Sequence, residues 1–269
     1  MDDILVADSA TQLGEEAKGR IVVCGSHGGV YAAWLCARAG VRGVILHDAG
    51  IGRHSAGVSG VIWLAGLGIP ACAVDHRSAR IGDARDLLDN GTISTANEVA
   101  AVFGCLPGHT ARQSARCMDE NAPPVEQDEE LPTFGETRKR IPNTGHRAVW
   151  AIDSVSLVRA EDRRAIVVTG SHGGLLGGRD DGLPAEDVFA ALFNDAGGGK
   201  DDAGFARLAA LDPRGIAAAT VSCHSARIGD GRSTYETGVL SRVNEVAARL
   251  ELKPGMTARE AVARLVGLG

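Results

Sequence analysis

The chain has 269 residues, a formal net charge of −6 at pH 7 and 44% apolar residues, but only 4% aromatic ones. This balance predicts a packed core of Ala, Val, Leu and Ile, and it excludes the basic surface that a nucleic acid requires. The six cysteines form no CxxC pair and the acidic N-terminus lacks a signal-peptide pattern, so we expect a reduced, cytoplasmic setting.

Apolar runs alternate with helical patterns through the first part of the chain. Continuous apolar runs predict strands that are buried on both faces, as in a parallel sheet. In chain order the pattern predicts strands at 4–7, 20–24, 41–47 and 70–76, with helices at 10–18, 30–39, 56–66, 94–104 and 109–116. Residues 57–74 carry no charge. We interpret them as a buried helix, turn and strand rather than a membrane span.

The second part of the chain restates the first. IVVCGSHGG at 21–29 returns as IVVTGSHGG at 166–174, and SARIGD at 78–83 returns at 225–230. Residues 47–112 align with 194–259 without a gap, at close to half of the positions identically. This pattern predicts an internally duplicated α/β protein. Its two lobes, at 1–117 and 147–269, would be related by a pseudo-twofold axis, each with a mainly parallel sheet covered by helices.

The segment between the repeats, 118–146, is rich in Pro and in charge, which is typical of a linker or surface excursion. The repeats also differ after GSHGG. An apolar helix is expected at 30–39, whereas Gly and Pro interrupt residues 175–184, which favours a loop there, acting as a lid.

The shared motifs all follow predicted strands, where ligands bind in open parallel sheets. In GSHGG, Gly173 and Gly174 would direct N–H groups at an oxyanion. Ser26 and Ser171 would donate hydrogen bonds or act as nucleophiles, and His27 and His172 would act as acids or bases. The competing interpretation is that the motifs are only turns, with each histidine filling or capping its turn.

Two further motifs add polar candidates. DAGxG supplies Asp195, with Lys200 behind it, for substrate binding. SARIGD supplies Ser78 and Ser225 at strand ends, with Ser225 as a second candidate nucleophile, and Arg80 and Arg227, whose planar guanidinium groups suit a carboxylate or an imide. Asp230 would support Arg227, and such pairing alone is the structural alternative.

Cys223 lies next to His224, and a cysteine beside a histidine suggests an activated thiolate. Neighbours on an extended strand point to opposite faces, so a buried and inert thiol is the alternative. The histidines have neither HExxH nor HxH spacing. We therefore expect no metal and no other cofactor.

The repeat-built plan resembles that of ring-opening amidohydrolases of the cyanuric acid hydrolase and barbiturase kind, which use three repeats and a Ser-Lys pairing. It also resembles that of aspartate and glutamate racemases, which have two similar α/β lobes with a Cys from each. This chain has two repeats, no such Lys and no symmetric Cys pair, so no residue role is transferred.

The motifs predict an enzyme acting on a small polar molecule. The leading hypothesis is a hydrolase that cleaves a C–N bond in a small amide, imide or cyclic amide. The alternatives are a cofactor-independent racemase, isomerase or lyase using Cys and His, and a non-catalytic binding protein. We expect a small-molecule partner, neither nucleic acid nor membrane, and leave a homo-oligomer open.

Overall fold

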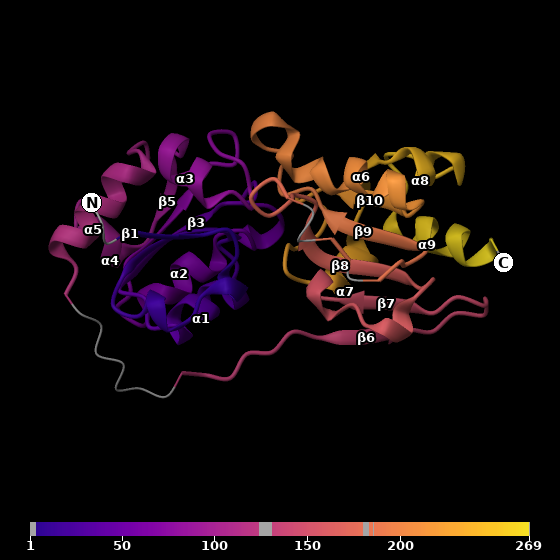
Figure 1. Ribbon diagram of the computed structural model, residues 1–269, viewed down its shortest axis with the longest axis horizontal. Coiled ribbons are helices and arrows are strands. Elements are labelled where there is room, and N and C mark those ends of the chain that lie inside the picture. The colour runs from indigo at the N-terminus through magenta and orange to yellow at the C-terminus, as the bar shows by residue number, and fades with distance from the viewer. Residues whose placement is uncertain (1–3, 124–130, 180–182, 185, 269) are drawn as a thin grey trace.

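Two separate β-sheets organise the chain, as Figure 1 shows for a computed structural model that describes residues 4–123, 131–179, 183–184 and 186–268. The first sheet has the order β1-β2-β3-β4-β5 and the second β11-β10-β9-β8-β7-β6. The strands of the first are β1 (Ile4–Ala7), β2 (Ile21–His27), β3 (Gly43–His47), β4 (Ala71–Val74) and β5 (Ile93–Ala96). Those of the second are β6 (Arg138–Ile141), β7 (Val149–Ile152), β8 (Ile166–His172), β9 (Ala190–Asn194), β10 (Ala217–Val221) and β11 (Leu240–Val243).

Both sheets are mainly parallel, so the protein is of the α/β class. The strands β1 to β4 pair in parallel, as do β7 to β10, while β5, β11 and β6 are antiparallel edge strands. Apart from the additional edge strand β6, the two sheets have the same strand order and directions. Because parallel strands share their carboxyl edge, the loops after β2, β3 and β4 gather on one side of their sheet.

Helices cover both faces of each sheet. In the first half, α1 (Val30–Arg38) and α2 (Ser59–Ala65) pack on one face, and α3 (Ala84–Asn90) and α5 (Ala111–Asn121) on the other. In the second half, α6 (Ala206–Leu211) covers one face, opposite α7 (Gly231–Thr237) and α9 (Ala258–Gly267). The short helices α4 (Glu98–Val102) and α8 (Glu245–Arg249) follow the edge strands β5 and β11. The buried residues between these layers are mostly Ala, Val, Leu and Ile, as the composition predicts.

Several predicted elements need correction. Residues 93–96 form strand β5, not the start of a helix, because Asn97 rather than Ser94 caps the helix that follows. The helix predicted at 10–18 is two short 3-10 turns, and helix α3 was not predicted. The segment 118–146, expected to be a linker or surface excursion, begins inside α5 and contains β6, which pairs with β7.

The uncharged stretch 57–74 forms helix α2, a turn and strand β4. Among the described residues, no helix has the length and hydrophobicity needed to cross a bilayer. In the predicted loop at 175–184, the described part contains a bridge between Leu176 and Arg179, and residues 180–182 lie outside the description.

His47 and Asn194 occupy aligned positions and make the same two bonds. His47 Nδ1 accepts from Ala49 N at 3.0 Å and its Nε2 lies 3.1 Å from Ala79 O, while Asn194 Oδ1 accepts from Ala196 N at 2.9 Å. Asn194 Nδ2 donates to a backbone carbonyl at 3.2 Å. Since an amide reproduces one acceptor and one donor, either side chain can bond to one backbone N–H and one backbone carbonyl at this position.

We therefore expect His47→Asn to change the free energy of unfolding by less than about 1 kcal/mol, whereas His47→Ala should cost about 3 kcal/mol, because it leaves a buried N–H and a buried carbonyl unpaired. Urea denaturation of the two variants measures the difference. An equal loss of stability in both variants would show that these two hydrogen bonds are not what His47 contributes.

Candidate functional site

The two halves meet through backbone contacts of their glycine-rich loops. Arg53 N donates to Cys223 O at 2.7 Å, and in the reciprocal contact Lys200 N donates to His76 O at 2.8 Å. A Cβ placed on Gly197 would lie 2.9 Å from the Cα of Gly50. Side chains are therefore excluded here, which accounts for glycine in both DAG loops.

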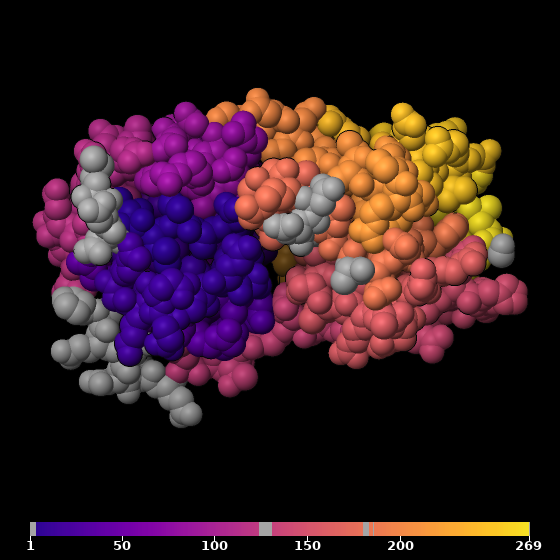
Figure 2. All heavy atoms as spheres, in the orientation of Figure 1, coloured from indigo at the N-terminus to yellow at the C-terminus, as the bar shows by residue number. Residues whose placement is uncertain are grey.

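A cavity of about 690 Å³ lies between the halves, beside this contact. Figure 2 shows the surface hollowed between the indigo residues of the first half and the pink to salmon residues of the second. Its wall contains both Ser-His pairs of the GSHGG motifs, the acidic residues Glu136, Asp153 and Asp230, the arginines Arg207 and Arg227, and apolar side chains such as Val30, Tyr31, Leu35, Phe134 and Ile228. Its volume is that of a typical small-molecule site.

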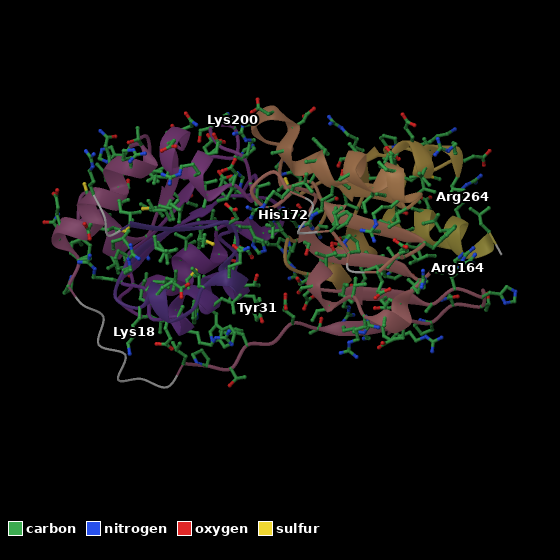
Figure 3. All side chains as sticks on the ribbon, in the orientation of Figure 1. Lys18, Tyr31, Arg164, His172, Lys200 and Arg264 are labelled. Carbon is green, nitrogen blue, oxygen red and sulfur yellow. The ribbon has the colours of Figure 1, made fainter. Side chains whose placement is uncertain are left out.

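The two histidine rings enter the cavity from β2 and β8 and cross between the halves. A Cβ placed on Gly229, in the second half, would lie 3.3 Å from His27 Cε1. One placed on Gly82, in the first half, would lie 3.5 Å from His172 Cε1. Figure 3 shows His172 at the boundary between the halves, with Tyr31 on the side of the first half. Each GSHGG motif thus contributes to one shared site.

The protonation of both rings is set by the turn that follows them. Nδ1 of His27 accepts from Gly29 N at 3.1 Å, and Nδ1 of His172 accepts from Gly174 N at 3.1 Å. A neutral ring with Nδ1 as acceptor carries its proton on Nε2. Burial lowers the pKa of His27 to about 4, helped by His47. Burial also holds the pKa of His172 well below its usual range, with Arg207 and His27 adding to the effect.

Both rings are therefore neutral at neutral pH, and in the described part of the chain neither Nε2 has a hydrogen-bond partner. Two backbone N–H groups of the second GSHGG motif already donate hydrogen bonds within the protein. Gly173 N donates to Asn194 O at 2.8 Å, and Gly174 N is held by His172. The expected backbone oxyanion site is thus not available at these two N–H groups, whereas the imidazole Nε2–H groups are available as donors.

The serines of the motif lie beside the rings. Ser26 Oγ accepts from Ala10 N and Ser171 Oγ accepts from Val155 N, both at 2.9 Å. Both serines line the cavity. Among the described residues, no basic side chain accepts the Ser171 hydroxyl proton, so the geometry offers hydroxyl donors rather than an activated nucleophile.

Glu136 is a cavity residue that the sequence analysis missed, because it lies in the supposed linker. Burial raises the pKa of its carboxyl above the ordinary value, the nearby Asp153 raises it further, and a hydrogen bond from Ser154 partly offsets both. The carboxylate of Asp153 is occupied, since it accepts from Thr137 N at 2.7 Å and from Gly231 N at 3.1 Å. Glu136 is the wall carboxyl with the properties of a general base.

Arg207 is the second missed residue. It is only 3% exposed, it lines the cavity, and its Nε and Nη1 have no hydrogen-bond partner in the described ranges. Burial lowers the pKa of its guanidinium to about 9, and the Phe193 ring lies 5.3 Å from its Cζ. The group thus remains charged at neutral pH, without a carboxylate partner among the described residues.

Ser78 and Ser225 lie outside the cavity wall and bind backbone. Ser225 Oγ donates to Ser222 O at 2.7 Å and accepts from Val239 N at 2.9 Å, and Ser78 makes the equivalent bonds. Ser225 thus lies outside the cavity that Ser171 lines.

We expect Ser225→Ala to lower the free energy of unfolding by about 1–2 kcal/mol and to leave ligand binding in the cavity unchanged. Denaturation and ligand titration of this variant test both parts, and loss of binding without loss of stability would contradict them.

The two arginines of the SARIGD motifs also differ. Arg227 lines the cavity, and its Nη2 donates to Asp230 Oδ2 at 2.5 Å. Arg80 lies outside the cavity wall and bridges the halves to Asp201, at 2.8 Å. Asp230 in addition caps α7 by accepting from Ser233 N at 2.7 Å. The aspartate of this SARIGD motif therefore has a structural role.

The remaining candidates line a second hollow of about 430 Å³. Burial, with Asp195 next, raises the pKa of the Cys223 thiol to about 12, which is unfavourable for a thiolate nucleophile. Asp195 accepts from Cys223 N at 2.8 Å and from Gly197 N at 3.0 Å. Lys200 Nζ donates to Asp86 at 2.7 Å.

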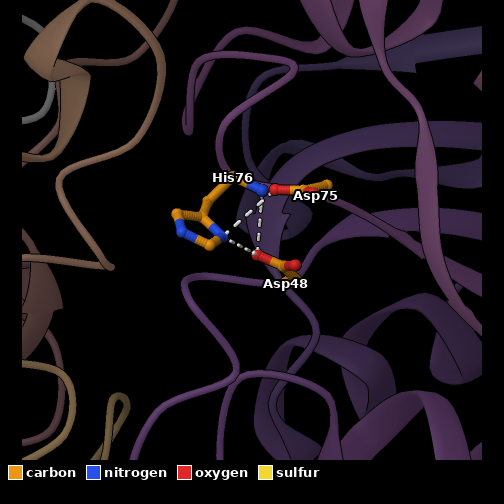
Figure 4. Close-up of side chains that lie close together, drawn as sticks. All are labelled: Asp48, Asp75 and His76. Carbon is orange, nitrogen blue, oxygen red and sulfur yellow. Dashed lines mark hydrogen bonds and ion pairs between the residues drawn. The ribbon is translucent and has the colours of Figure 1, made fainter.

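Near this hollow, Asp48, Asp75 and His76 bring three metal-ligand atoms within 4.8 Å of one another (Figure 4). Asp48 Oδ1 already accepts from His76 N at 3.0 Å and from Gly50 N at 2.9 Å, and it lies 3.1 Å from His76 Nδ1. Asp75 is held by Arg77 at 2.6 Å. These bonds indicate that the cluster holds the loop after β4 in place.

No family model, no curated protein and no solved structure matches this chain. The functional conclusion therefore depends on the chemistry of the cavity.

Proposed function

We propose that the cavity between the halves is the active site of a hydrolase that cleaves a C–N bond in a small polar amide or imide. The observation that carries the proposal is the pair of neutral histidines, His27 and His172. With each Nδ1 held by the backbone, each Nε2–H is a donor for a carbonyl oxygen in a buried site. Fixed donors of this kind stabilise the negative charge that develops on that oxygen when a nucleophile adds.

Glu136 supplies the proton transfer. Its carboxylate removes a proton from water, and the water oxygen forms a bond to the amide carbon while the carbonyl electron pair moves to the oxygen held by the histidines. When the tetrahedral intermediate collapses, the C–N bond breaks and Glu136 returns the proton to the leaving nitrogen. The products are a carboxylic acid and an amine or ammonia. A raised carboxyl pKa suits both halves of this transfer.

This assignment gives the GSHGG histidines a role as donors rather than bases, since the ring nitrogen that faces the cavity already carries a proton. Ser171 and Ser26 then orient the substrate through their hydroxyl groups. Proton transfer by a Cys223 thiolate, the racemase alternative, has no support from this geometry, because Cys223 lines the other hollow and its pKa is raised to about 12.

The test is a panel of small amides, imides and cyclic amides incubated with the protein in ¹⁸O-labelled water and followed by ¹³C NMR and mass spectrometry. We expect cleavage of at least one class, with one labelled oxygen in the new carboxyl group. Recovery of every compound unchanged, including those that bind, would overturn the proposal in favour of a binding protein.

A further inference from the structure

Arg207 has no counterpart side chain in the first half. The aligned residue of the first half is Gly60, and a Cβ placed there would lie 2.4 Å from Gly29 O and 2.5 Å from Ala33 Cβ, because α1 packs directly against it. In the second half an arginine occupies this position and lines the cavity, and the described residues that follow GSHGG form no helix.

Burying an arginine at this position lowers the stability of the folded protein. A buried guanidinium whose Nε and Nη1 have no hydrogen-bond partner among the described residues loses hydration at these atoms, and it lies over the face of the Phe193 ring. The other wall arginine, Arg227, is paired with Asp230. Arg207 is thus a wall cation without a carboxylate partner among the described residues, and an anionic ligand in the cavity would balance its charge.

The charges of the wall limit that anion. Three carboxyl groups, those of Glu136, Asp153 and Asp230, line the cavity together with two guanidinium groups, and the histidines are neutral. A dianion such as phosphate would add two charges to this excess of negative charge, whereas a carboxylate adds one and pairs with Arg207, which has no carboxylate partner among the described residues. The planar fork of arginine also matches the two oxygens of a carboxylate.

We propose that Arg207 binds the carboxylate of the ligand, and that the substrate class is an N-acylated amino acid with an apolar side chain. The amide would lie at the histidine pair, an assignment that rests on the proposed function. The apolar part of the ligand would contact the wall formed by Tyr31, Leu35, Phe134 and Ile228. The volume of about 690 Å³ accommodates such a molecule.

The experiment measures binding, not turnover. N-acetylated apolar amino acids, each paired with its uncharged primary amide, are titrated into the whole protein by calorimetry, with inorganic phosphate as a competitor. We expect at least one acid to bind tenfold or more tightly than its amide, and phosphate not to compete. Equal binding of acid and amide, no binding by any acid, or displacement by phosphate would each overturn the proposal.

Arg207→Met tests the residue directly. We expect the preference for the acid to disappear, while the Tm of the ligand-free protein rises by about 3 °C, because a buried unpaired charge has been replaced by an apolar chain of similar length. A purely structural arginine would instead lower the Tm. Arg147→Met is the control, since Arg147 also stacks on a ring, that of Phe189, but lies outside the cavity wall. It should leave the preference intact.

The two proposals fail separately. If the acids bind through Arg207 but no amide is cleaved, the protein binds carboxylates without hydrolysing them. If neutral amides are cleaved as fast as the acids, the hydrolase stands and the carboxylate anchor is wrong.

Discussion

His172→Asn is expected to lower kcat by about 10²–10³-fold while the protein keeps its fold. Loss of one donor to a developing oxyanion has effects of this size. Asparagine keeps the acceptor for Gly174 N, as Asn194 does for Ala196 N at the position where the first half has His47. Its shorter amide, however, withdraws the donor from the carbonyl oxygen. Steady-state kinetics on the substrate found in the panel, together with the Tm, measure the two parts.

His47→Asn is the matched control, because it makes the same chemical change at a ring whose Nε2 lies against Ala79 O. It should retain full activity. An active His172→Asn enzyme would contradict the donor role, and a variant that loses kcat only because it unfolds would be detected by its Tm.

Glu136→Gln is expected to reduce kcat by about 10²–10⁴-fold, the usual contribution of a general base. The pH profile gives a second readout. A base must be ionised, so activity of the wild type should fall as the pH drops through the raised pKa of Glu136, above its ordinary value near 4.5. The residual activity of the variant should lack that inflection. Rates across pH 4 to 8 measure both effects.

Glu161→Gln provides the control, since Glu161 is 63% exposed and lies 3.7 Å from Arg159 on the surface. Unchanged kcat in Glu136→Gln would remove the carboxyl from the mechanism, whatever the histidines do.

The α/β class and the position of the motif loops could be predicted, because buried parallel strands leave continuous apolar runs and their carboxyl ends share one edge. Repeated residues were harder to interpret. The side chain of Asn97, in the NEVAA motif, is buried and holds two backbone segments together. It accepts from Ala71 N at 3.1 Å and from Ala100 N at 2.9 Å. Its counterpart Asn244 makes the same bonds. Identity between the halves therefore reports shared architecture as often as shared chemistry.

Arg207 and Glu136 escaped prediction for the opposite reason. Arg207 aligns with a glycine and Glu136 lies between the repeats, so neither belongs to a recurring motif. Their importance follows from burial and from the crossing of the two halves, which no local pattern encodes. That the halves arose by duplication stays a prediction from the sequence.

The proposed mechanism requires His27 and His172 to face the cavity as neutral Nε2–H donors. Long-range ¹H–¹⁵N correlation spectra of ¹⁵N-histidine-labelled protein, recorded from pH 8 to 4, test it most directly. We expect both rings to hold the Nε2–H tautomer through neutral pH, with His27 titrating near 4 and His172 remaining neutral well below 6.5. Rings that carry their proton on Nδ1, or that titrate near 6.5, would contradict it.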